Sequence, residues 1–228
     1  MFTKDNLNNY LSALGKEFRK LNGTKMSAEI ILVGGAAILA NYGFREMTYD
    51  VDAIISASSV MEDAINRVGD QMGLPFNWLK SDFKVTNSYS HKLSAVSIPY
   101  QVFSNILNVR TVSAEYLVAM KLMSGRRYRS DLSDILGILW EHEKNNNPLT
   151  LKIIDEAVIL LYESWNQIPE ETREFINAAF TNGNYEKLFL YNRKSEEEIK
   201  EILTDNNKAY PDKVKEESSE EILKKLRR

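Results

Sequence analysis

Two aspartates, Asp50 and Asp52, stand two residues apart at the start of an apolar run, 51–55, with the sequence VDAII. Successive side chains of a β-strand point to opposite faces, so both carboxylates are expected on one face. Carboxylates this close repel each other unless a cation lies between them. Mg²⁺ prefers oxygen ligands and often uses one or two carboxylates together with substrate phosphates. The spacing therefore predicts a metal site on a strand; the alternative is that these acids cap a turn or face solvent.

A glycine pair, Gly34 and Gly35, lies between the apolar run 30–33 and a short helical segment, 36–42. The backbone N–H groups at a helix start favour an anion, and glycine lets a phosphate approach without meeting a Cβ atom. The spacing is neither that of the dinucleotide-binding fingerprint nor that of a P-loop. A phosphate site after one strand and a metal site on the next are the parts that phosphoryl transfer needs.

These residues, together with Arg45 and Thr48, resemble the signature of the nucleotidyltransferase superfamily, which includes DNA polymerase β. The segment GGAAILANYGFREMTYDVDAI more closely resembles the bacterial branch that holds the abortive-infection type IV toxins and related uncharacterised nucleotidyltransferase families. The segment WLKSDFKVTNSYSHKL is similar to one of those uncharacterised families. The resemblance covers about residues 28 to 140.

The resemblance implies roles for these positions. Gly34 and Gly35 would contact the phosphates of an NTP substrate, and Asp50 and Asp52 would hold Mg²⁺ or Mn²⁺. Arg45 and Thr48 match positions that stabilise this loop or approach the nucleotide. For Arg45 and Thr48, a loop salt bridge and a turn hydroxyl are an equally good interpretation.

Further site residues are expected in the second half of the chain. Many polymerase-like members carry a third carboxylate on a later strand, but residues 83–114 contain no Asp or Glu. The segment VSAEYLVAMKLMSGRRYRSDLSDILGIL again resembles the type IV toxin branch, in which a lysine and an aspartate on consecutive helices complete the site. Those positions match Lys121 and Asp131, with Asp134 and Arg127 as possible supporting residues.

Each of these residues also has a structural interpretation. Lys121 can extend from an apolar helix face into solvent, and Asp131 is favourable at a helix start because of the helix dipole. Arg126, Arg127 and Arg129 can meet nucleotide phosphates or an RNA backbone, or can pair with the nearby aspartates.

The elements that must position these residues follow from apolar periodicity and turn residues. Helices are predicted over 6–21, 36–42 and about 58–71, and strands over 30–33, 51–55, 93–103 and 106–112. Pro99 favours an edge or a bulge in its strand. A helix that begins after Ser113 is predicted to carry Lys121, and the pattern predicts helices from Asp131 nearly to the end of the chain.

We therefore expect an α/β (α+β) nucleotidyltransferase fold, in which a small mixed sheet with flanking helices precedes a helical C-terminal half. Residues 1–112 would form the core, and 113–228 a helical region whose first helices complete the site. The net charge of −3 and the absence of cysteine exclude a broadly basic nucleic-acid binder, disulfides and thiolate sites. The chain shows neither a signal peptide nor a run of about 20 apolar residues, so we expect a cytoplasmic protein with no membrane partner.

The predicted function is Mg²⁺-dependent transfer of an NMP from an NTP to an acceptor hydroxyl. The acceptor would be a tRNA, a protein or a small molecule, and the resemblance favours a toxin-like role on tRNA with a cognate antitoxin. The alternative is a non-catalytic nucleotide-binding or antitoxin-like regulatory protein that keeps the fold. The missing third carboxylate favours that alternative, and the intact Asp-x-Asp pair speaks against it.

Overall fold

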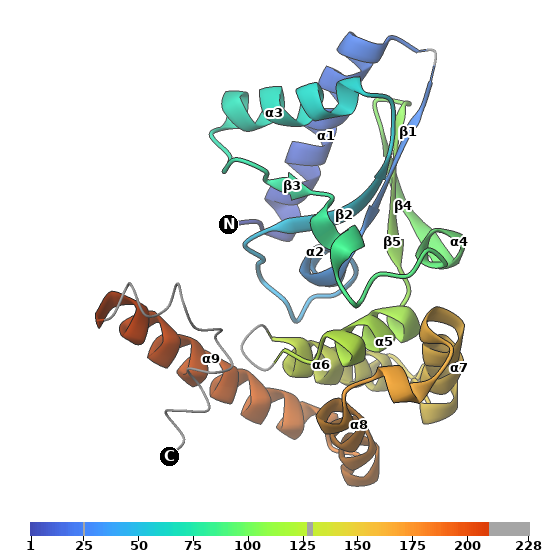
Figure 1. The fold of residues 1–228 in the computed structure, drawn as a ribbon, viewed down its shortest axis with the longest axis vertical. Coiled ribbons are helices and arrows are strands. Elements are labelled where there is room, and N and C mark those ends of the chain that lie inside the picture. Colours follow the sequence, from blue (N-terminus) through green and yellow to red (C-terminus); the bar gives the residue numbers. More distant parts are fainter. Residues whose placement is uncertain (25, 127–129, 210–228) are drawn as a thin grey trace.

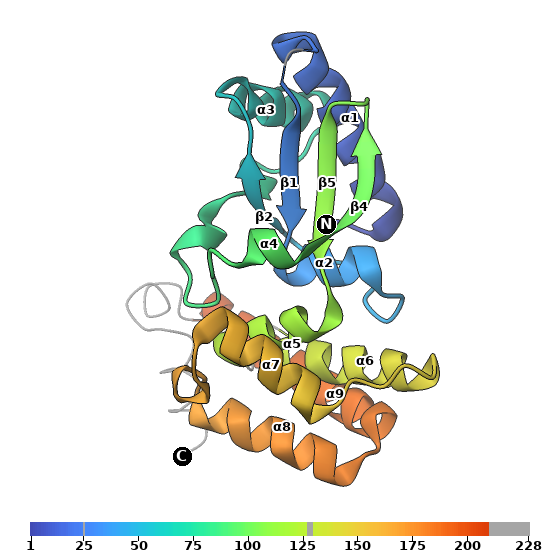
Figure 2. The same cartoon turned by 90° about the vertical axis from the view of Figure 1, so that its right-hand side faces the viewer.

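The computed structural model describes residues 1–24, 26–126 and 130–209, and it places a five-stranded sheet beside a group of helices (Figures 1 and 2). In the order β3-β2-β1-β5-β4, β1 pairs antiparallel with β2 and parallel with β5. β3 pairs parallel with β2, and β4 antiparallel with β5. The strands are β1 (Ala28–Leu32), β2 (Val51–Ser56), β3 (Leu79–Lys80), β4 (Ser97–Phe103) and β5 (Leu107–Val112). The predicted mixed sheet is confirmed.

Two helices, α1 and α3, cover one face of this sheet (Figure 1). α1 buries its apolar stripe, and Thr3 caps its first turn with a hydrogen bond from the Asn6 N–H group. The helices of the first half are α1 (Lys4–Asn22), α2 (Gly34–Asn41), α3 (Val60–Met72), α4 (Leu93–Val96) and the 3₁₀-helix η1 (Asp82–Val85).

The second half of the described chain is helical, which confirms the prediction. It lies beyond the end of the sheet where β1 and β5 finish and β2 begins (Figures 1 and 2). Its elements are α5 (Ala114–Ser124), α6 (Asp131–Lys144), α7 (Leu151–Tyr162), the 3₁₀-helix η2 (Trp165–Gln167), α8 (Glu170–Asn182) and α9 (Tyr185–Ala209). Among the residues described, no helix combines the length and apolar character needed to cross a membrane.

The predicted strand over 93–103 is partly wrong. Residues 93–96 form α4, and the strand begins only at Ser97. Leu93 and Val96, three residues apart, both pack on the core, which is helical spacing rather than alternation. The prediction for Pro99 is confirmed, because β4 is an edge strand with a register shift between Pro99 and Gln101. β3 was missed, since two residues carry no periodicity.

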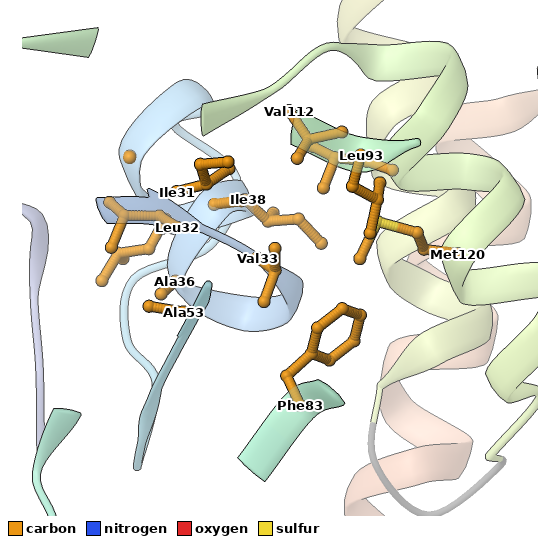
Figure 3. Close-up of a cluster of buried hydrophobic side chains, with 14 of the residues drawn as sticks. Ile31, Leu32, Val33, Ala36, Ile38, Ala53, Phe83, Leu93, Val112 and Met120 are labelled. Carbon is orange, nitrogen blue, oxygen red and sulfur yellow. The ribbon is translucent and has the colours of Figure 1, made fainter. Parts of the chain in front are cut away.

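A cluster of buried apolar side chains joins the sheet to the helical half. Val33 follows β1, Phe83 comes from η1 and Met120 from α5, and all three are buried (Figure 3). Because this cluster lies around the start of α2, it fixes α5 relative to the glycine pair.

A second contact holds the loop between α2 and β2 against α6. A Cβ atom added to Gly137 of α6 would lie 2.5 Å from the Phe44 ring, so the ring occupies the space that only glycine leaves. The rings of Tyr42 and Phe189 pack on Phe44, with centroids 5.5 and 5.6 Å away. The loop is therefore fixed at the residue that precedes Arg45.

Replacing Gly137 by Ala tests this contact. The free energy of unfolding is expected to fall by up to about 2 kcal/mol, because overpacking costs about 1–3 kcal/mol and a helical Gly-to-Ala change returns about 1 kcal/mol. Urea denaturation measures the difference. Gly43→Ala is the control, since nothing lies within 4 Å of a Cβ atom there. Equal stabilities of the two variants would show that Phe44 moves aside freely.

Candidate functional site

The glycine pair lies directly beside Asp52. The Val33 N–H group donates to the Asp52 carbonyl oxygen at 3.0 Å, which brings the end of β1 to the start of β2. Gly34 opens α2 with a φ of +56°, a conformation that favours glycine. A Cβ atom on Gly34 would lie 3.7 Å from Asp52 Oδ2. The structure thus brings together the residues to which the sequence assigned phosphate binding and metal binding.

Asp50 and Asp52 provide two oxygen-donor side chains at this point. Both are partly buried; Asp52 lies in β2 and Asp50 directly precedes this strand, so strand alternation continued to Asp50 would place both on the same side. In the parts of the chain that the structure describes, no group of three or more His, Asp or Glu residues is arranged to hold a metal ion. A pair of carboxylates nevertheless suits Mg²⁺, which often takes its remaining ligands from water and substrate phosphates.

Arg45 and Thr48 pack against the second glycine. A Cβ atom on Gly35 would lie 2.8 Å from Thr48 Oγ1 and 3.0 Å from Arg45 Nη2, so a larger residue does not fit. Thr48 is buried, and its backbone exchanges two hydrogen bonds with Phe2, at 2.8 and 2.9 Å. Arg45 Nε donates to the Met47 carbonyl oxygen at 3.1 Å. Both side chains therefore support the glycine pair, while a contact with nucleotide stays a prediction.

A buried ion-pair network connects Arg45 to the helical half. Arg45 Nη1 lies 2.5 Å from Asp134 Oδ2, and Lys121 Nζ lies 2.8 Å from the same oxygen. Lys121 Nζ also donates to Asp131 Oδ1 at 2.6 Å. Asp131 and Asp134 are three residues apart on α6 and face the same side. The loop, α5 and α6 therefore meet through one set of charges, which we call the ion network (Arg45, Lys121, Asp131 and Asp134).

The ion network is closed to solvent. Asp131 and Asp134 are 0% exposed and Lys121 is 5% exposed. Burial alone would raise the pKa of Asp131, but Lys121 and Arg126 outweigh it and hold that pKa below its ordinary value. Burial likewise opposes the charge on Lys121, but Asp131 and Asp134 outweigh it and raise the Lys121 pKa. Both groups are therefore charged at neutral pH and satisfied inside the protein.

The basic cluster beside the network is described only in part. The Arg126 backbone N–H group and side-chain Nε both donate to Asp131 Oδ2 at 3.1 Å, which is one of the two predicted interpretations. Arg127 and Arg129 lie outside the described residues. The strands β4 and β5 carry no acidic residue, so neither of them supplies a third carboxylate.

Lys80 is a further residue at this site, and it was not predicted from the sequence. In the parallel pairing of β2 with β3, Lys80 lies opposite Asp52, and its Nζ atom lies 3.7 Å from Asp50 Oδ2. Only the register of a two-residue strand places it there, so local sequence carries no signal for it.

Glu196 of α9, beside the ion network, is a second residue that was not predicted from the sequence. Its carboxylate accepts a hydrogen bond from the Ser133 N–H group at 3.1 Å and another from the Ser133 hydroxyl. Ser133 stands between the two aspartates of the ion network. Burial raises the pKa of Glu196 to about 7, with a further contribution from Asp134 and opposition from the Ser133 hydrogen bonds and Arg193. Glu196 is the buried member of the run of three glutamates 196–198, and nothing in the sequence distinguishes it from its two exposed neighbours.

Removing the Lys121 charge is expected to destabilise the fold. Lys121→Met should lower the free energy of unfolding by about 3–5 kcal/mol, because it leaves two buried carboxylates without their shared cation. Lys152→Met, at an 84% exposed side chain, is the control and should change stability by less than about 0.5 kcal/mol. Adding Asp131→Asn to Lys121→Met should recover part of the lost free energy of unfolding, as measured by urea denaturation. No recovery would contradict the pairing.

Glu196 predicts a pH dependence of stability. Because its pKa is raised in the folded state, its protonated form favours folding; this contribution is full below pH 4.5 and is lost as the pH rises through 7. Relative to Glu196→Gln, the wild type should lose no more than about 3 kcal/mol between pH 4.5 and 8. Glu197→Gln, at a 65% exposed side chain, is the control. If the free energy of unfolding depends on pH in the same way in wild type and Glu196→Gln, the raised pKa of Glu196 would be contradicted.

The comparison with protein families agrees with this geometry. The profile of the family described as "Nucleotidyltransferase of unknown function (DUF6036)" matches residues 9–169, which is more than half of the chain. The match includes the glycine pair, both aspartates and the ion network. No curated protein and no solved structure matches the chain. The chain therefore belongs to this nucleotidyltransferase family.

Proposed function

We propose that the protein transfers an NMP from an NTP to an acceptor hydroxyl with the help of Mg²⁺. The observation that carries this proposal is the position of Gly34, whose missing Cβ atom would lie 3.7 Å from Asp52 Oδ2. A helix start that favours phosphate thus lies beside Asp52, one of two carboxylates suited to a divalent cation. Membership of a nucleotidyltransferase family supports the reaction class.

In this proposal the N–H groups of Gly34 and Gly35 bind the β- and γ-phosphates, and Asp50 and Asp52 hold Mg²⁺ or Mn²⁺. The bound metal ion would neutralise phosphate charge and orient the α-phosphate for in-line displacement. The acceptor oxygen forms a bond to the α-phosphorus while the bond to pyrophosphate breaks, and the hydroxyl proton leaves to solvent or to a nearby base.

The residues of the ion network are proposed to act mainly by positioning. Lys121 and Asp131 are buried and paired, so a direct role in neutralising phosphate or activating the acceptor requires that they leave these ion pairs. We infer instead that they hold Asp134, which holds Arg45 against Gly35. The glycine pair would then owe its position to charges on α5 and α6.

The proposed acceptor to test first is tRNA. This choice rests on the resemblance to type IV toxins, which also implies a cognate antitoxin as partner. A protein side chain or a small molecule is the alternative acceptor.

A second candidate is a nucleotide-binding regulatory protein without catalysis. The absence of any acidic residue from β4 and β5 favours it, because a third carboxylate from a later strand is then missing. Such a protein would bind Mg²⁺ and NTP without forming pyrophosphate, and this distinguishes the two candidates.

Neutralising either aspartate is the direct test of the site. Asp50→Asn and Asp52→Asn should each lower NTP affinity in the presence of Mg²⁺ by at least about tenfold, because losing a charged ligand costs about 1.5–3 kcal/mol. Equilibrium dialysis with labelled NTP measures this affinity. Asp63→Asn on α3 removes an exposed acid and is the control. NTP binding that neither Asn variant affects would overturn the proposed site.

The reaction is tested with each labelled NTP, Mg²⁺ and total cellular RNA or protein. Label transferred to tRNA in wild type, and absent with Asp52→Asn, is the expected result. Tight NTP binding without any labelled product or pyrophosphate would favour the regulatory candidate.

A further inference from the structure

Lys80 and Asp50 form an ion pair that is long and partly open to solvent. Lys80 Nζ lies 3.7 Å from Asp50 Oδ2, and each side chain is 37% exposed. Ion pairs of this kind contribute at most about 1 kcal/mol. The Lys80 ammonium can therefore leave Asp50 at little cost.

The backbone of Lys80, by contrast, is firmly held. The preceding residues Trp78 and Leu79 are 2% and 4% exposed. Trp78 Nε1 donates to the Ile65 carbonyl oxygen at 3.0 Å, and the rings of Phe2 and Tyr10 pack on the indole. The side chain of Lys80 is thus more mobile than its backbone, and its reach includes the start of β2, where Asp50 and Asp52 lie.

Within the described residues, Arg45, Lys121 and Arg126 are already paired with carboxylates of α6. Lys121 and Arg45 share Asp134, and Lys121 and Arg126 share Asp131. Lys80 differs, because its ion-pair partner Asp50 is itself a proposed metal ligand. Its positive charge becomes available when Asp50 binds a metal ion.

We propose that Lys80 is a phosphate-binding residue that exchanges partners: its ammonium neutralises Asp50 in the nucleotide-free protein and binds a triphosphate oxygen when Asp50 and Asp52 hold Mg²⁺. This inference rests on the proposed function. The charges support it, since two carboxylates balance one divalent cation and leave the charge of Lys80 to face the phosphates. An ammonium bound to a phosphate oxygen forms a charge-assisted hydrogen bond, stronger than its exposed pair with Asp50.

The test compares Lys80→Gln with two other variants. Lys80→Arg keeps the charge, and Lys84→Gln removes an exposed charge from the neighbouring η1. One titration measures Mn²⁺ binding to nucleotide-free protein by electron paramagnetic resonance. The other measures binding of a non-hydrolysable NTP analogue at saturating Mg²⁺ by equilibrium dialysis.

In Lys80→Gln the affinities for Mn²⁺ and for the NTP analogue should change in opposite directions. Mn²⁺ affinity should rise, by up to about fivefold, because a competing cation is removed. Analogue affinity should fall by about tenfold, because a charge-assisted hydrogen bond is lost. Lys80→Arg should keep analogue affinity within about threefold of wild type, and Lys84→Gln should change neither quantity by more than about twofold.

A residue that only stabilises β3 would not produce opposite changes. Unchanged analogue affinity in Lys80→Gln, or a loss of both affinities, overturns the inference. If wild type binds the analogue and Asp52→Asn abolishes that binding, such a result counts against Lys80 alone. If wild type does not bind the analogue, the proposed function and this inference fail together.

Discussion

Two carboxylates on one face of α6, Asp131 and Asp134, are fully buried and are neutralised by cations from other segments of the chain. Removing a charge from water is costly unless a partner of opposite charge lies in contact with it. Arg45 and Lys121 therefore cannot move away from α6 without leaving an uncompensated charge. This constraint fixes the loop before β2 and the end of α5 relative to α6, and the glycine pair is packed against that loop.

The glycine pair is the point where backbone geometry and electrostatics meet. Gly35 is favoured because Thr48 Oγ1 approaches closer than a Cβ atom allows and Arg45 also lies close, and Gly34 adopts a positive φ beside Asp52. Because Gly34 and Gly35 have no side chains, a phosphate could approach the start of α2. The absence of a Cβ atom at Gly35 also lets Arg45 of the ion network pack there. The proposed nucleotide site and the junction between the sheet and the helical half are thus built from one set of contacts.

The local parts of this arrangement were predictable. The Asp-x-Asp pair, the glycine pair and the helical face of Asp131 and Asp134 depend on residues a few positions apart, and strand or helix periodicity alone fixes their orientation. Predictions failed where local patterns are weak. Residues 93–96 were predicted as strand but form α4, and the two residues of β3 show no periodic pattern. Glu196 could not be recognised, because its burial depends on how α9 packs on α6.

The sequence by itself determined the class of fold, the helical character of the second half and the two motifs that point to nucleotide chemistry, since each of these depends on short-range spacing. Only the tertiary structure decided that Lys121 pairs with Asp131 inside the protein, that Arg45 pairs with Asp134, and that Lys80 lies beside Asp50. Arg45 and Asp134 are 89 residues apart in the chain. Periodicity shows which face of a helix or strand a residue occupies, but charge pairing between distant segments depends on how those faces pack.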